Sequence, residues 1–253
     1  MENQLETEYR KSLNSIKIFL ESDHSADLKE EADYMIVGYF RKACHLVNET
    51  LRMNRQKEFD DENIVLAHVS RSIIEYVSSA VWLSNNKDLW LNVIAKDIDS
   101  KRNIAKELGC DSRVNKLISL NYFKPSQIYR NNYFPNKLEE NDITSLKSKI
   151  LTPFKQIKYL DTWLTKRHPE PGQYRGAIIF AYALISTLET HPTYKAIEQH
   201  LQSPHNGFPL VAGYGRTISP TEESPTKSFY NSTILITFCI YELGVARPQQ
   251  ERV

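Results

Sequence analysis

Two long stretches of the chain constrain its fold more than any other feature, because both repeat apolar residues at helical spacing. Residues 27–56 place apolar side chains three and four positions apart, and Gly38 is the only Gly or Pro among them. Residues 61–85 show the same periodicity after the acidic turn "FDDEN". We therefore expect two long antiparallel helices, joined by a short turn at about 57–61, with no strand in either.

Residues that start and stop helices divide the rest of the chain. Asp27, with Glu30 three positions later, predicts the start of the first long helix. Gly109 and Gly244 stand where helices are expected to end. Periodicity predicts further helices at residues 3–21, 88–108, 143–166, 173–189, 193–201 and 227–244. The predicted fold class is all-α.

The length of the chain and its regions of weak periodicity define the expected domain organisation. A chain of 253 residues can bury a sizeable core, and we expect a single helical domain over residues 1–253. Its expected parts besides the central helices are an N-terminal helical segment (1–26), an irregular insertion (96–142), a long loop before the last helix (202–226) and a frayed tail (245–253). A loop as long as 202–226 is usually functional or disordered.

The charges of the chain are nearly balanced overall but uneven along it. The formal net charge is +1, which argues against a protein that binds polyanions over its whole surface. Residues 1–62 hold nine Lys and Arg against fourteen Asp and Glu, whereas residues 145–175 hold seven against two. This asymmetry permits a local anionic partner.

The termini, apolar runs and cysteines predict the compartment. The first residues, "MENQLETEYRKSLN", lack an apolar signal core, so export is not expected. The most apolar runs, "GAIIFAYALISTL" and "STILITFCIYELGV", are too short to span a bilayer and are interpreted as buried helices. Cys44, Cys110 and Cys239 lie far apart, which indicates neither a disulfide framework nor a zinc site and suits a reducing cytoplasm.

The helix expected at 61–85 carries a polar strip that allows two interpretations. At 100° per residue, its apolar side chains cover more than half of the circumference. The polar residues gather in the remaining arc: Asp61, His68, Arg71, Ser72, Glu75, Ser78 and Ser79. This strip is either a solvent-exposed face with one weak ion pair between Arg71 and Glu75, or a seam enclosed by other helices that builds a site. The wide apolar arc favours enclosure.

Two stretches of this chain resemble a known group of helical proteins. "SRSIIEYVSSAVWL", residues 70–83, resembles an early helix of uncharacterised bacterial proteins grouped with the HEPN-like domains, in which an Arg-x-x-x-Glu lies in an apolar helix. "YALISTLETHPTYKAI", residues 182–197, resembles their later helix that ends in a His-Pro pair. The resemblance extends over roughly residues 30–245 and is carried by these two stretches.

The resemblance implies a HEPN-like helical bundle in which Arg71, Glu75 and His191 converge, with Tyr182 or Glu189 nearby. It implies an intracellular protein of a prokaryotic conflict or stress system, of the antiphage or toxin type, that acts on RNA or a nucleotide. An enzyme of this kind would be a metal-independent nuclease or a nucleotide-directed hydrolase without a cofactor. Arg71 would neutralise a phosphate, and His191 would serve as acid or base. Glu75 would orient Arg71 or His191.

The chain departs from the family's nuclease motif, in which a His follows an Arg after four to six residues. None of the seven histidines follows an Arg at that distance, and Arg41 and His45 come closest with three residues between them. This departure counts against RNA cleavage by that motif. A second hypothesis therefore stays open, a non-catalytic helical module that binds a partner protein or a second copy of itself. Arg71 and Glu75 would then fix the register of the helices.

The remaining candidates are single residues and short stretches. His68, Tyr182 and Arg216 are candidate substrate-binding residues, and Arg216 follows a Gly-rich turn that suits either a phosphate or a loop tip. The stretch "NYFKPSQIYRNNYF" interleaves aromatic and basic residues, as single-strand binders do and as rings packed under a loop also do. No standard zinc spacing is found among His191, His200 and His205, so no metal site is predicted.

Overall fold

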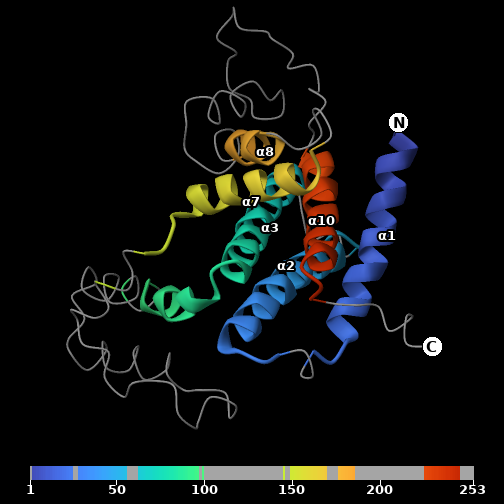
Figure 1. Cartoon of the computed structure of the whole chain (residues 1–253). Helices are drawn as coiled ribbons and strands as arrows, with labels where there is room; N and C mark the ends of the chain where they lie inside the picture. Colours follow the sequence, from blue (N-terminus) through green and yellow to red (C-terminus); the bar gives the residue numbers. More distant parts are fainter. Residues whose placement is uncertain are drawn as a thin grey trace, which may run out of the picture. The chain divides into compact units, whose positions relative to one another are not determined.

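The structure, a computed structural model, describes residues 2–24, 28–55, 62–96, 99, 145, 149–169, 176–185 and 225–245. These residues are mostly helical and contain no strand, so the described part of the chain is all-α, as predicted (Figure 1). The chain divides into two compact units, one made of residues 1–85 and 153–253 and the other of residues 86–152. The expectation of a single domain stays a prediction.

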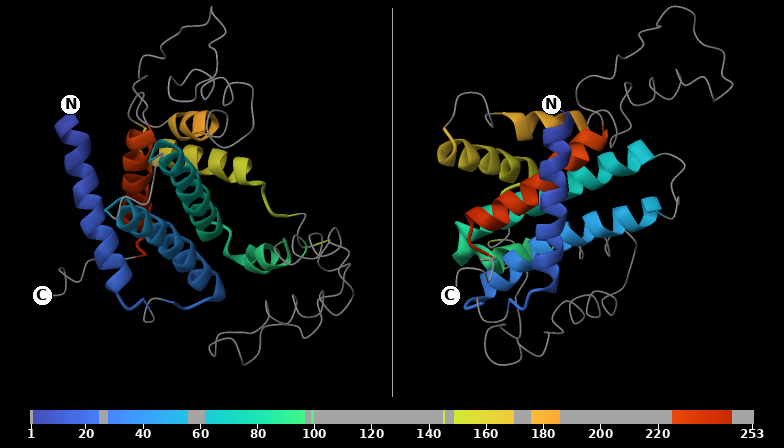
Figure 2. Two further views of the ribbon diagram at one scale, coloured as in Figure 1. Left: turned by 180° about the vertical axis from the view of Figure 1, so that it is seen from behind. Right: turned by 90° about the vertical axis from the view of Figure 1, so that its right-hand side faces the viewer.

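The two long helices of the first unit are α2 (Glu31–Arg55) and α3 (Glu62–Ser84). They pack against each other, and the colours in Figure 2 show that they run in opposite directions. The predicted antiparallel pair is thus confirmed. Both helices supply fully buried side chains to the core, among them Phe40, Ala43, Val47, Ile73, Val77, Ala80 and Val81.

The start of α2 differs from the prediction. The helix begins at Glu31, and Asp27 lies outside the described residues. Oδ2 of Asp33 accepts hydrogen bonds from the backbone N–H groups of Lys29 (3.2 Å) and Glu30 (3.1 Å). An acid within the first turn therefore holds the chain that enters the helix, and its charge also suits the positive end of the helix dipole.

Helices α1 (Glu2–Glu21) and α10 (Pro225–Glu242) pack against each other, and α10 also packs against α3. Tyr9 of α1 stacks on Tyr230 of α10 with ring centroids 3.9 Å apart. The hydroxyl of Thr237 donates a 3.0 Å hydrogen bond to the hydroxyl oxygen of Ser12. The predicted N-terminal helix is confirmed, and α10 connects it to the core.

Two shorter helices, α7 (Pro153–Arg167) and α8 (Ala177–Ile185), pack against α3 and against each other. The helix predicted at 143–166 is not continuous, because residue 145 is helical but residues 149–152 are not, and α7 begins only at Pro153. A proline lacks the backbone N–H and disfavours helical backbone in the residue before it, so it suits the first turn. The start of α8 was also predicted too early, since Gly176 precedes it with a φ of +79°.

The last helix shows one difference at its start and agreement at its end. It begins at Pro225, inside the loop predicted at 202–226, again with proline in the first turn. Gly244 ends it, as predicted, with a φ of +64°. Val245 N–H donates to Ile240 O (3.1 Å) and Gly244 N–H to Tyr241 O (3.0 Å), the bonds of a Schellman motif.

In the second unit, Lys87–Leu89 form the 3-10 helix η2, and residues 90–96 are α-helical. The helix predicted at 88–108 is therefore confirmed as far as residue 96. Most of the predicted insertion at 96–142 and the predicted helix at 193–201 lie outside the described residues. Among the helices that the structure describes, none combines the length and apolar character needed to cross a membrane.

Two of the three cysteines are core residues, as expected. Cys44 of α2 and Cys239 of α10 are fully buried. Burial raises the pKa of the Cys44 thiol to about 12, and burial followed by the charge of Glu242 also raises the pKa of Cys239. Both thiols are therefore protonated and unreactive near neutral pH. Cys110 lies outside the described residues.

Candidate functional site

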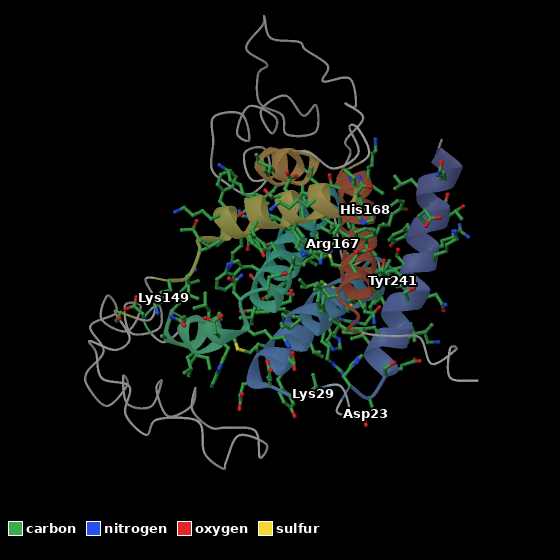
Figure 3. All side chains as sticks on the ribbon, in the orientation of Figure 1. Asp23, Lys29, Lys149, Arg167, His168 and Tyr241 are labelled. Carbon is green, nitrogen blue, oxygen red and sulfur yellow. The ribbon has the colours of Figure 1, made fainter. Side chains whose placement is uncertain are left out.

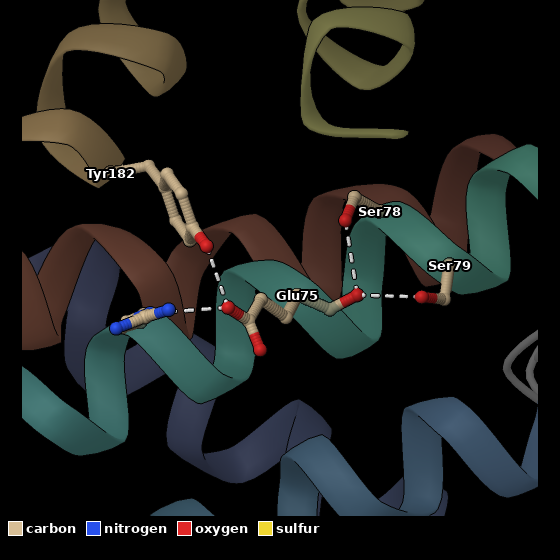
Figure 4. Close-up of polar contacts among 5 residues, drawn as sticks. Glu75, Ser78, Ser79 and Tyr182 are labelled. Atoms are coloured by element: carbon tan, nitrogen blue, oxygen red, sulfur yellow. Dashed lines mark hydrogen bonds and ion pairs between the residues drawn. The ribbon is translucent and has the colours of Figure 1, made fainter. Parts of the chain in front are cut away.

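Glu75 is the centre of a polar cluster on α3 (Figure 4). Its Oε1 accepts hydrogen bonds from Nε of Arg71 (3.1 Å) and from the hydroxyl of Tyr182 (2.7 Å). The guanidinium carbon of Arg71 lies 5.4 Å from the centroid of the Tyr182 ring, within cation–π range. We name these three side chains the Arg–Glu–Tyr cluster. It joins α3 to α8, and it brings together three of the six site residues expected from the sequence.

Apolar packing places Tyr182 at this position. Its ring is 8% exposed and belongs to a buried cluster with Ala67 and Ile74 of α3 and Ile157 of α7. Residues 67, 71, 74 and 75 follow the pattern i, i+4, i+7 and i+8, so they share one face of α3. The face that receives the Tyr182 ring therefore also presents Glu75 to its hydroxyl.

The polar strip of α3 is neither fully exposed nor fully enclosed, so its burial is intermediate between the two interpretations of the sequence. The side chains of Arg71 and Glu75 are 24% and 35% exposed, whereas those of the surface pair Arg52 and Glu49 are 54% and 59% exposed. Ser78, placed in the polar arc by the sequence, is fully buried. The strip is thus partly enclosed, and the ion pair lies at the border between core and solvent.

The cluster affects the ionisation of two of its members. Burial lowers the pKa of Arg71, but hydrogen bonds and charge interactions with Tyr182 and Glu75 outweigh it, so the pKa is raised. The pKa of Tyr182 is also raised, by burial and by its bond to Glu75, against a smaller opposing effect of Arg71. At neutral pH the cluster therefore holds a charged guanidinium and a neutral phenol that donates to the carboxylate.

The polar strip continues from α3 to α7. The hydroxyls of Ser78 and Ser79 lie 3.0 Å and 2.9 Å from the backbone oxygen of Glu75 and donate to it (Figure 4). The Ser79 hydroxyl also lies 2.9 Å from Oε1 of Gln156, which is buried. Gln156 was not among the residues expected from the sequence. In the sequence, its position is marked by an amide that shares a face of the predicted helix with Leu160 and Trp163.

A second buried polar contact fixes the start of α8. Asp161 of α7 is 6% exposed, and both of its carboxylate oxygens lie 3.0 Å from the backbone nitrogen of Gly176, which donates to them. Gly176 has the positive φ that glycine adopts without strain. Because α8 follows directly, this contact helps to set the position of Tyr182. Asp161 was not among the expected site residues either.

The remaining expected site residues do not join the cluster in the described structure. His68 is exposed on α3, one turn before Arg71, and is not among the contacts of the cluster. His191, Glu189 and Arg216 lie outside the described residues, as does the stretch "NYFKPSQIYRNNYF". Across the part of the chain that is described, no three His, Cys, Asp or Glu side chains gather as they would around a metal ion.

Comparison of the chain with protein-family models, with curated proteins and with solved structures finds no match. The cluster therefore has to be interpreted from its own chemistry. That chemistry is a fixed cation, a carboxylate that holds it, and a phenol from a second helix.

Proposed function

We propose that this is a HEPN-like helical protein of a prokaryotic conflict or stress system, which acts on RNA or a nucleotide in the cytoplasm. The observation that carries the proposal is the position of Arg71 in the Arg–Glu–Tyr cluster. Its guanidinium is held by Glu75 at 3.1 Å and is 24% exposed at the border between core and solvent. In this proposal the Arg71 guanidinium binds the phosphate of the ligand.

A fixed guanidinium suits a phosphate for physical reasons. It stays protonated at any pH at which the protein is folded, and its planar fork matches two phosphate oxygens. Arg71 donates to Glu75 through Nε and lies beside the Tyr182 ring, so its direction is set before a ligand arrives. Preorganisation of this kind reduces the entropy lost on binding.

The other site residues take roles that follow from their places. Glu75 positions Arg71, and the neutral hydroxyl of Tyr182 fixes Glu75. His68 is exposed one helical turn away, where it can contact a ligand bound at Arg71. We assign His191 the role of acid or base, because an imidazole side chain suits proton transfer near neutral pH. We assign Arg216 the role of a second phosphate contact.

A second candidate function is that of a non-catalytic module that binds a partner protein or a second copy of the chain. The charge balance of the cluster favours it, because Arg71 and Glu75 neutralise each other. Moreover, both hydrogen bonds to Oε1 of Glu75 come from within α3 and α8. On this alternative the cluster serves to fix α8 on α3.

Incubation of the purified protein with single-stranded RNA and with nucleoside triphosphates, in the absence of added metal, tests the proposal. Chromatography should detect a product from one of these substrates. Loss of a proton-transfer residue typically costs about 100-fold or more in rate, and we expect this for His191→Ala and a comparable loss for Arg71→Gln. The control Arg52→Gln on α2 should retain the wild-type rate. If folded wild-type protein leaves all substrates intact, the non-catalytic alternative stands instead.

A further inference from the structure

Helix α7 carries a charge imbalance that the Arg–Glu–Tyr cluster does not use. It contains four basic residues and one acidic residue, Asp161. That carboxylate is buried and accepts the N–H of Gly176, so it does not offset charge on the exposed side of the helix. Helix α1 differs, because Arg10 and Lys11 form ion pairs with Glu6 and Glu8 of the same helix.

Three of the four basic residues lie on one exposed face. Lys155, Lys158 and Lys166 are all exposed, and their spacing of three and eight positions keeps them on one side of α7. None of them forms an ion pair within the described residues. Phe154 lies on the same face with 42% exposure, and Nζ of Lys158 lies 4.8 Å from the centroid of its ring. We name these four residues the α7 strip.

The fourth basic residue, Arg167, does not belong to the α7 strip. Its Nε lies 3.6 Å from a carboxylate oxygen of Glu242, and its guanidinium carbon lies 4.0 Å from the centroid of the Trp163 ring. Figure 3 shows Arg167 where α7 meets α10. This residue therefore ties two helices together, and the strip of uncompensated charge consists of the three lysines.

We propose that the α7 strip binds the phosphate backbone of a single-stranded nucleic acid, with Phe154 beside an unpaired base. From Lys155 to Lys166 the helix rises by about 16 Å, so the lysines form a row that matches successive phosphates better than one compact nucleotide. A row of cations beside an exposed aromatic ring is the usual way to hold a single strand. The inference rests on the proposed function and deepens it, because it selects a polynucleotide over a free nucleotide.

An anionic membrane fits the strip less well. A helix that lies on a membrane inserts an apolar face into the lipid. The apolar face of α7 is already used, since Ile157, Leu160 and Leu164 are fully buried. Phe154 is the one large apolar side chain on the strip, so the strip offers charge without an apolar face to insert.

Fluorescence anisotropy with labelled 20-nucleotide RNA and DNA strands of the same sequence, over a range of salt concentrations, tests this proposal. The variant K155A/K158A/K166A should bind at least about tenfold more weakly at low salt. For this variant, the slope of log affinity against log salt concentration should be shallower by about 2, because each phosphate contact contributes roughly 0.7 to the slope. Phe154→Ala should weaken binding about fivefold or more. The control K11A/K17A/K42A, with the same change in charge on α1 and α2, should bind as the wild type does.

Equal affinity of the α7 variant and the control variant would overturn the proposal. So would binding to anionic phosphatidylserine vesicles in place of either strand. Turnover or binding of nucleoside triphosphates without binding of RNA or DNA would refute the α7 strip and leave the proposed function intact. Conversely, strand binding that requires the three lysines, in a protein whose Arg71→Gln variant behaves as wild type, would support the strip and refute the proposed role of Arg71.

Discussion

The hydroxyl of Tyr182 donates a hydrogen bond of 2.7 Å to Oε1 of Glu75, although the two residues are 107 positions apart in the chain. The same oxygen accepts from Arg71, so one carboxylate oxygen links a residue of α8 to a neighbour on α3. A change to any of the three side chains therefore alters the environment of the other two.

Tyr182→Phe removes the bond to Glu75 and leaves the buried ring in place. Hydrogen bonds to charged groups contribute roughly 1.5–3 kcal/mol, and Glu75 keeps Arg71 as a donor, so we expect a loss of about 1–2 kcal/mol in the free energy of unfolding. Urea titration measures it. Tyr159→Phe is a matched control, since Tyr159 is half-buried and has no hydrogen bond within the described residues. A loss as small as that of the control would mean that the bond adds no stability.

Arg71→Ala tests how far the ion pair is enclosed. Exposed pairs contribute under about 1 kcal/mol, and breaking a sealed pair costs roughly 3–5 kcal/mol. Because Arg71 is 24% exposed and Glu75 keeps Tyr182 as a donor, we expect a loss of about 1–2 kcal/mol. Arg52→Ala, which removes the surface pair on α2, should change stability by less than about 0.5 kcal/mol. If Arg71→Ala and Arg52→Ala reduced stability equally, the pair of Arg71 and Glu75 would have to be interpreted as a solvent-exposed surface pair.

Asp161→Ala should loosen the start of α8. It removes the carboxylate that accepts the partly buried N–H of Gly176, and because hydrogen bonds to charged groups contribute roughly 1.5–3 kcal/mol, we expect a loss of about 1–2 kcal/mol in the free energy of unfolding. In a protein of this size each kcal/mol lowers the melting temperature by roughly 2–4 °C, so thermal unfolding detects it. Asp161→Asn keeps an acceptor oxygen and should retain more stability than Asp161→Ala. If Asp161→Ala and Asp161→Asn have the same melting temperature, the contact with Gly176 does not stabilise the start of α8.

The stability of the protein should fall at alkaline pH, in part through Tyr9. Burial, and then the charge of Tyr230, raises the pKa of Tyr9 to about 12. A raised pKa means that the folded state favours the neutral phenol. The contribution of Tyr9 to the free energy of unfolding is therefore complete below about pH 10 and is lost as the pH approaches 12. Between pH 8 and pH 11 this loss amounts to about 1.4 kcal/mol. Tyr9→Phe should remove that part of the pH dependence, whereas an unchanged alkaline loss would exclude Tyr9 as its source.

Much of the fold followed from periodicity, because the spacing of apolar residues reports which face of a helix is buried. That spacing predicted α2, α3 and the first and last helices. It did not predict the starts at Pro153 and Pro225 or the turn at Gly176, since these depend on local backbone chemistry that apolar spacing does not record. The sequence signal for the two helix starts is proline, which favours the first turn of a helix.

The site was less predictable than the fold. The pairing of Arg71 with Glu75 follows from their spacing on one helix. Tyr182 entered through the resemblance, and its bond to Glu75 depends on how α8 packs on α3. Gln156 and Asp161 were missed because their partners, Ser79 and Gly176, lie on other elements. A buried polar residue is visible in a sequence as a break in an apolar face, but its partner is not.

The affinity of Arg71→Gln for labelled RNA and for adenosine triphosphate tests directly whether Arg71 binds the phosphate of the ligand. Circular dichroism should first show that the variant is folded. Of the two ligands, we expect the one that wild-type protein binds more tightly to bind Arg71→Gln about tenfold or more weakly, because charged hydrogen bonds are lost. Arg52→Gln should bind it as the wild type does. A folded Arg71→Gln protein that binds both ligands as tightly as the wild type would contradict the proposed role of Arg71.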